Sequence, residues 1–241
     1  KPGRIWISSG AAEIGRIDYV RRTGRQLDND DQLNKVDYAA QGQAILMQEY
    51  RKYINPLYGV RQVLVEHQHY NNPAKRELLK SLLLRCPAQG VVPIINYNDP
   101  LSNDEIVKLE IRALTQSGMA ESEVVHCVDN DETASQTACL LKCRRLIIFT
   151  STLGIYSSAG DPSTLISEIS GKDVYEVIDN ITACQSACIG SSRKGAGGAK
   201  AKLEYIKAPV MNGTEVFIAS PQFRIEDVIS GKVKCTRIGV R

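Results

Sequence analysis

The chain has 241 residues, of which 43% are hydrophobic and 24% are charged, and this length suffices for one large α/β domain or two small ones. A net charge of +3, with scattered basic residues and no accompanying aromatic stripe, gives no basis for a nucleic-acid or membrane-surface partner. Because no apolar run approaches the ~20 residues that span a bilayer, we expect a cytoplasmic protein.

The seven cysteines are an odd number in a chain of this length, which argues against a disulfide framework and favours reduced thiols. Two C-x₃-C pairs, Cys139/Cys143 and Cys184/Cys188, would each share one face of a helix. A structural zinc site needs a complete set of four ligands, usually held in turns. Since Cys139 and Cys143 lie in an apolar run, buried thiols are favoured over metal ligands, and we expect no protein-bound metal site.

Short apolar runs alternate along the chain with longer segments of helical period. The expected strands are 4–8, 60–65, 91–95, 145–150 and 216–219, and the expected helices are 34–54, 74–86 and 131–142. The apolar positions expected to face inward are Val36, Ala39, Ala40, Leu46, Met47, Tyr50 and Ile54 in the first helix, and Leu78, Leu79, Leu82 and Leu83 in the second. Such alternation predicts a mostly parallel sheet with helices on both faces.

In open parallel sheets, ligands bind beyond the carboxyl ends of the strands, so polar residues just after each strand are candidates. The first such segment is Ser8-Ser9-Gly10-Ala11-Ala12. Small residues at a strand-to-helix turn leave backbone N–H groups open to an anion. The alternative is an ordinary turn in which a serine caps the helix.

Two further polar segments follow in the chain. Residues 96–99, Asn-Tyr-Asn-Asp, end a buried strand and suit an ammonium group, or else form a turn closed by Pro100. Residues 129–133, Asp-Asn-Asp-Glu-Thr, precede an apolar helix. They suit a ligand-orienting cap or plain helix capping, and the EF-hand calcium spacing is absent.

The fourth segment, 194–202, combines glycines and lysines. Glycines allow a backbone to approach phosphates, and lysines supply the charge that phosphoryl transfer requires. The segment is not a Walker A loop, because Ala196 stands where that pattern requires lysine. A solvated loop is the alternative.

Taken in this order, the segments resemble the amino-acid kinase family, and within it the branch that phosphorylates glutamate. The matching strings are Ser8-Ser9-Gly10-Ala11, Asn34-Lys35 with 39–43, 92–99, Asp129-Asn130-Asp131, and 195–198 with Lys202. The resemblance implies an α/β fold, a three-layer αβα sandwich around a mainly parallel sheet. It implies a single domain whose half at about 1–140 holds the amino acid and whose half at about 141–241 holds ATP.

The activity implied by the resemblance is phosphorylation of the L-glutamate side-chain carboxylate by ATP with Mg²⁺, the first step of proline biosynthesis, in a homo-oligomer. Ser9, Gly10, Asp99 and Asn130 match substrate-binding positions. The positions that match the ATP site are Thr150, Ser151, Gly195, Gly197, Gly198 and Lys202, of which Lys202 is the catalytic lysine that contacts the transferring phosphate.

The sequence departs from the family pattern at several points. Ser151 replaces an expected aspartate and Tyr97 replaces an acid. The family's first strand, with its K-x-G-(S/T) motif, has no counterpart, and no RNA-binding-like domain is expected at the C-terminus. These departures keep two alternatives open: a binding or sensor protein without catalysis, and a kinase for another small acid.

Overall fold

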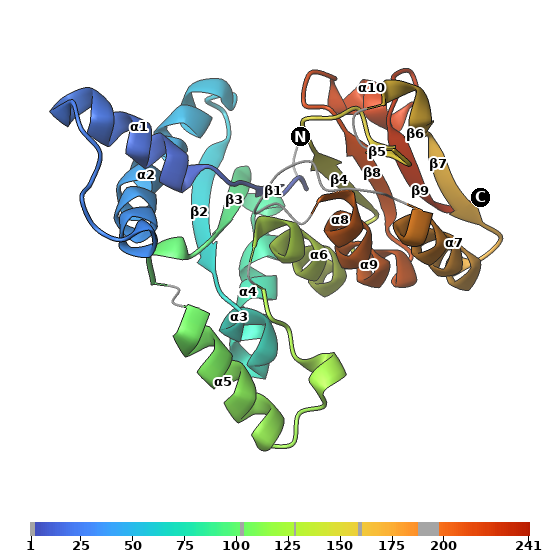
Figure 1. Cartoon of the computed structure of the whole chain (residues 1–241), viewed down its shortest axis with the longest axis horizontal. Helices are drawn as coiled ribbons and strands as arrows, with labels where there is room; N and C mark the ends of the chain where they lie inside the picture. The colour runs from blue at the N-terminus through green and yellow to red at the C-terminus, as the bar shows by residue number, and fades with distance from the viewer. Residues whose placement is uncertain (1–2, 102–103, 128, 159–160, 188–197) are drawn as a thin grey trace. The chain divides into compact units, whose positions relative to one another are not determined.

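The computed structural model describes residues 3–101, 104–127, 129–158, 161–187 and 198–241. The chain divides into two compact units, Lys1–Thr133 and Ala134–Arg241. The elements of the first unit are β1 (Trp6–Ile7), α1 (Ala11–Thr23), α2 (Asp31–Tyr53), β2 (Gly59–Val65), α3 (Gln68–Asn71), α4 (Pro73–Arg85), β3 (Val91–Tyr97) and α5 (Asp104–Gln116) (Figure 1). The boundary between the units falls within α6 (Asn130–Leu141).

The strands of the first unit form a parallel three-stranded sheet in the order β1-β3-β2. Ile7 pairs with Ile95, and Val65 pairs with Tyr97. β3 is therefore the central strand, and all its residues from Val92 to Tyr97 are buried. Because the strands are parallel and in this register, their carboxyl ends lie along the same edge of the sheet.

Helices α1 and α2 lie side by side (Figure 1) and approach each other at two glycines. A Cβ at Gly15 would lie 1.9 Å from the carbonyl oxygen of Tyr38, and a Cβ at Gly42 would lie 1.8 Å from that of Ala11. Only glycine permits such a backbone approach, so Gly42, in the matching string 39–43, has a packing role.

The elements of the second unit after α6 are β4 (Arg145–Phe149), β5 (Ile155–Tyr156), β6 (Leu165–Ile166), β7 (Glu168–Gly171), α7 (Val174–Ala187), α8 (Gly198–Tyr205), α9 (Lys207–Met211), β8 (Glu215–Ala219), α10 (Ile225–Ile229) and β9 (Thr236–Val240). Four strands form a sheet in the order β4-β8-β9-β7, and β5 and β6 form a separate hairpin. The β4–β8 and β7–β9 pairs are parallel, and the β8–β9 pair is antiparallel.

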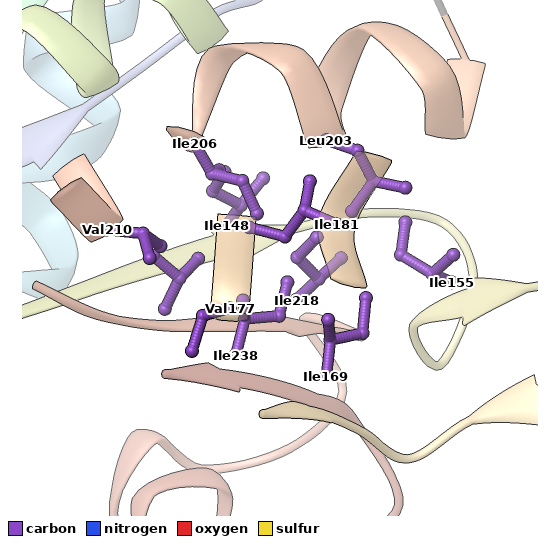
Figure 2. Packing of buried hydrophobic residues seen from close by; sticks show 11 residues of the cluster. Ile148, Ile155, Ile169, Val177, Ile181, Leu203, Ile206, Val210, Ile218 and Ile238 are labelled. Carbon is purple, nitrogen blue, oxygen red and sulfur yellow. The ribbon is translucent and has the colours of Figure 1, made fainter. Parts of the chain in front are cut away.

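The main hydrophobic core of the second unit lies between its helices and one face of its sheet (Figure 2). Val177 and Ile181 of α7 and Leu203 of α8 meet Ile218 and Ile238 of the sheet there, and all five are fully buried. Helix α8 is thereby fixed to the sheet through Leu203. The opposite face of the sheet carries a smaller hydrophobic cluster, which includes Phe217 of β8 and Val228 of α10.

The expected α/β fold with a mainly parallel sheet and covering helices is confirmed. Two burial predictions are wrong: Ala40 is exposed, and Leu78 has 68% of its surface exposed. In α4, Leu79 and Leu83 lie four residues apart and occupy the inner face, so Leu78, about 100° away on the helix, points outward. In α2, the α1 contact uses the face of Tyr38, Ala39 and Gly42 instead of that of Ala40.

Candidate functional site

The carboxyl edge of the first sheet brings together three of the predicted segments. The backbone N–H of Ser8 donates to the carbonyl of Ile95 at 2.9 Å, and that of Asn98 donates to the carbonyl of Val65 at 2.9 Å. Each strand ladder therefore continues one residue past its strand. The residues that follow β1, β2 and β3 emerge at one edge of the sheet.

The turn after β1 ends at Gly10, which is the N-cap of α1 and has a φ of 98°. This left-handed conformation favours glycine. No described side chain caps α1, so the serine-cap alternative is wrong. Ser8 is buried instead, and its Oγ accepts a hydrogen bond from the Tyr50 hydroxyl at 2.8 Å. Ser9 and Gly10 are exposed at the edge, where the first N–H groups of α1 favour an anion.

Asn96, near the end of β3, is 1% exposed, and neither its Oδ1 nor its Nδ2 has a hydrogen-bond partner among the residues that the structure describes. The hydrogen bond from the Ser8 N–H to Ile95 places Ser8 beside Asn96 in the ladder. Buried polar groups without partners are rare, and each costs ~1–3 kcal/mol. A polar ligand would offset that cost, so this amide is an independent sign of a binding site at this edge.

Asp99 follows β3 in a short 3₁₀ turn, and one of its carboxylate oxygens lies 3.2 Å from the Lys35 ammonium of α2. The Asp99 side chain is 20% exposed, whereas that of Lys35 is 65% exposed. The preceding Asn98 is buried, and its Nδ2 donates to a Glu66 carboxylate oxygen at 2.5 Å. Glu66 was not among the predicted site residues, although it directly follows β2 and the carboxyl-end rule would have found it.

Asn130 is brought to the end of β3 by the first turn of α6. Its Oδ1 accepts a hydrogen bond from the backbone N–H of Tyr97 at 3.2 Å. Asp129 caps the helix, because its carboxylate accepts from the Glu132 N–H at 2.8 Å. The capping alternative is therefore confirmed for Asp129, while the Asn130 side chain bonds to β3. Gly10, Asp99 and Asn130 thus follow or contact strands of one sheet.

The segment that leads to Asp129 is held from two sides. Asn71 of α3 donates to the Val125 carbonyl at 2.7 Å and accepts from the Val125 N–H at 2.8 Å. Cys127 has a left-handed backbone with φ of 47°, and its buried Sγ lies 3.2 Å from the Thr133 hydroxyl. Cys127 is fully buried, and burial raises the pKa of its thiol to about 12.

In the second unit, the predicted ATP-binding residues that the structure describes follow β4 or lie on α8. The Thr150 N–H donates to the Ala219 carbonyl at 2.9 Å, so Thr150 extends the β4–β8 ladder and Ser151 is exposed just beyond it. Gly198 begins α8 with a φ of 62°. Gly195 and Gly197 lie outside the described residues.

Lys202 lies in the last turn of α8, next to the fully buried Leu203. The helix is also tied to its neighbours by hydrogen bonds: the Gln185 amide of α7 donates to the Lys200 carbonyl at 2.9 Å, and the Ser135 hydroxyl of α6 donates to the Tyr205 carbonyl at 2.5 Å. Lys202 is thus carried by a helix whose position is fixed at several points.

Among the described residues, no group of three or more histidine, cysteine or acidic side chains is placed to hold a metal ion. Burial raises the pKa of both Cys139 and Cys143, which are partly buried thiols. Within the described part of the chain, no helix is long and apolar enough to cross a membrane.

These features define an α/β protein with a polar edge beyond parallel strands, and comparison with known proteins identifies its class. Residues 4–220 match the amino acid kinase family, so the chain belongs to that family of phosphotransferases. The expected resemblance is confirmed.

Several glutamate 5-kinases are among the similar proteins. That of Clostridium perfringens is 28% identical over 236 residues, covering 95% of this chain and 77% of the relative. That of Dehalococcoides mccartyi is 29% identical over 97% of this chain and 57% of the relative, and that of Halalkalibacterium halodurans is 28% identical over 98% and 56%. The chain thus spans little more than half the length of the latter two.

A solved structure shares the fold. It is the carbamate kinase of Giardia lamblia bound to AMP-PNP, which matches with a TM-score of 0.51 and 14% identity over 98% of this chain and 84% of the other. At this identity the likeness shows the fold alone.

Proposed function

We propose that the protein transfers the terminal phosphate of ATP to the side-chain carboxylate of L-glutamate, in the first step of proline biosynthesis. The observation that carries this proposal is the edge of the first sheet, where Gly10, Asp99 and Asn130 follow or contact the strands. The buried Asn96 amide at this edge has no partner within the described part of the chain. The glutamate 5-kinase relatives support the choice of substrate.

Each residue of the edge has a task that its chemistry suits. The Asp99 carboxylate binds the substrate ammonium, and the Asn130 and Asn96 amides supply hydrogen bonds to the substrate's polar head. Ser9 and the N–H groups that follow Gly10 face the reacting carboxylate and the charge that grows during transfer. No covalent intermediate is required, because positioning and electrostatic stabilisation provide most of the catalysis in phosphoryl transfer.

In the second unit, we assign ATP to Thr150, Ser151, Gly195, Gly197, Gly198 and Lys202. Lys202 stabilises charge on the transferring phosphoryl group from a fixed helix. Mg²⁺ neutralises charge on the ATP phosphates when bound, and it takes most of its ligands from phosphate and water. That coordination fits a chain whose described residues offer no cluster of metal ligands.

The test is glutamate-dependent consumption of ATP, with the acyl phosphate trapped by hydroxylamine. The parent protein should form the hydroxamate. Lys202→Ala should lower turnover at least ~100-fold with little change in glutamate affinity, as expected of a group that acts on transition-state charge. An equal loss of glutamate affinity would contradict this role for Lys202.

A second candidate is a binding or sensor protein of the same fold. Ser151, which stands where the family pattern has an aspartate, favours it. Calorimetry separates the two proposals, because a sensor binds glutamate while its ATP turnover stays independent of glutamate. Tyr97 in place of an acid favours a test of other small carboxylic acids in the same assay.

A further inference from the structure

The proposed function assigns the substrate ammonium to Asp99 but gives no role to Lys35, which forms an ion pair with Asp99. Lys35 is the fifth residue of α2, and its Nζ lies 3.2 Å from Asp99 Oδ1. The two residues are 64 positions apart in the chain, yet both belong to the first unit. The pair therefore brings a cation to the edge of the sheet that also carries Gly10 and Asn130.

The contribution of this ion pair to folding stability does not explain its presence. The Lys35 side chain is 65% exposed, and ion pairs at such exposed positions contribute little to folding. They also rearrange at little cost. The lysine ammonium has three donors on a flexible stem, so it is able to stay near Asp99 while it contacts a second anion.

The charges at this edge indicate what that second anion is. Two carboxylates lie beside the end of β3. Asp99 pairs with Lys35, and Glu66 accepts a hydrogen bond from Asn98. A substrate ammonium on Asp99 brings the α-carboxylate of the same amino acid close to these acidic groups, and like charges at short range repel. A cation that already lies 3.2 Å from Asp99 offsets that repulsion.

Resting on the proposed function, we infer that Lys35 binds the α-carboxylate of the amino-acid substrate. Asp99 and Lys35 then form one receptor for a zwitterionic head group, with the carboxylate for the ammonium and the ammonium for the carboxylate. In this role Lys35 determines specificity for α-amino acids over compounds that lack the α-carboxylate charge.

The experiment compares L-glutamate with its α-amide, which keeps the ammonium and the reacting side-chain carboxylate but loses the α-carboxylate charge. In the parent protein, kcat/KM should favour glutamate by at least ~10-fold, the effect of one charge-assisted contact. Lys35→Ala should lower kcat/KM for glutamate by about that factor, through KM, and leave the value for the α-amide unchanged. The two compounds then become nearly equal.

Two variants serve as controls. Lys35→Arg keeps the charge and should keep most of the preference for glutamate. Lys52→Ala removes an exposed lysine of the same helix, one that pairs with Glu49 at 2.5 Å, and should change neither compound's kcat/KM.

Two results would overturn the inference: no preference in the parent protein, or an unchanged preference in Lys35→Ala. An unchanged preference in which both compounds lose activity equally would indicate that Lys35 acts in folding or in the chemical step. If the parent protein consumes ATP with neither compound, the proposed function fails and the inference fails with it. Activity with an unaltered preference in Lys35→Ala would overturn the inference alone.

Discussion

Replacing Gly42 by alanine probes the packing that holds the substrate turn in place. The new Cβ would lie 1.8 Å from the Ala11 carbonyl oxygen, 2.7 Å from its carbon and 2.8 Å from the Gly15 nitrogen. All three are backbone atoms, so no side chain is able to move aside. Restoring an ordinary contact of ~3.5 Å requires α1 and α2 to separate by roughly 1.5–2 Å.

Two effects of opposite sign decide the outcome. Alanine is favoured over glycine inside a helix by ~1 kcal/mol, so Gly42→Ala would stabilise α2 if there were room. Overpacking typically costs ~1–3 kcal/mol, and more when only backbone atoms are able to yield. We expect a net loss of about 2 kcal/mol, which lowers Tm by roughly 4–8 °C for a chain of this size.

Thermal unfolding shows directly whether Gly42→Ala stabilises or destabilises the protein. Ala44→Gly serves as the reference for the effect of helix propensity alone. Ala44 is an exposed position of α2, where only helix propensity changes and a loss of ~1 kcal/mol is expected. Since α1 begins directly after Gly10, Gly42→Ala should also weaken glutamate binding. A Tm equal to or above that of the parent protein would refute the close approach of α1 and α2.

Three further predictions concern single side chains. Cys127, whose buried thiol has a pKa raised to about 12, should resist thiol reagents at pH 8 until the protein unfolds; labelling as fast as in denaturant would contradict its burial. Partial burial alone would raise the pKa of Glu215, but hydrogen bonds from Arg145 and Arg237 outweigh it and hold that pKa below the ordinary range. The stabilisation from these ion pairs is therefore present at neutral pH and lost in acid. The Tm of Glu215→Gln should fall furthest below that of the parent protein near pH 7, and the difference should shrink as the pH falls below ~4. A difference that does not change with pH would argue against the ion pairs. Asn96→Leu removes an amide that has no hydrogen-bond partner in the described residues, so it should keep or raise Tm while glutamate binding, measured by calorimetry, falls at least ~10-fold. A lowered Tm with unchanged binding would mean that Asn96 is a structural residue.

Much of the architecture was predictable because hydrophobic periodicity reports burial directly. The buried run 91–95 lies within the central strand β3. The 3.6-residue pattern of 34–54 starts inside α2 and ends one residue after that helix ends. Periodicity did not give the contact partner of each helix face. Ala40 was placed inward because alanine is apolar, whereas the close approach of α1 selects the face that carries the small residue Gly42.

The candidate site was predictable where it depends on strand ends and less so where it depends on contacts distant in sequence. Gly10 and Asp99 follow strands, so the carboxyl-end rule located them. Two features of the site could not be read from the sequence: the Asn96 amide without a described hydrogen-bond partner, and the Lys35–Asp99 ion pair. Both depend on which residues distant in sequence come close once α2 and the sheet have packed.

Transfer of oxygen from glutamate to phosphate is the most direct test of the proposed reaction. The protein is incubated with ATP, Mg²⁺, hydroxylamine and glutamate labelled with ¹⁸O in its side-chain carboxylate. If that carboxylate attacks the terminal phosphorus, hydroxylamine then displaces the phosphate at the carbonyl carbon, and the released phosphate carries one ¹⁸O from glutamate. Our account predicts this labelled phosphate in amounts equal to the hydroxamate formed. Phosphate without the label would show that water is the acceptor and would contradict the account.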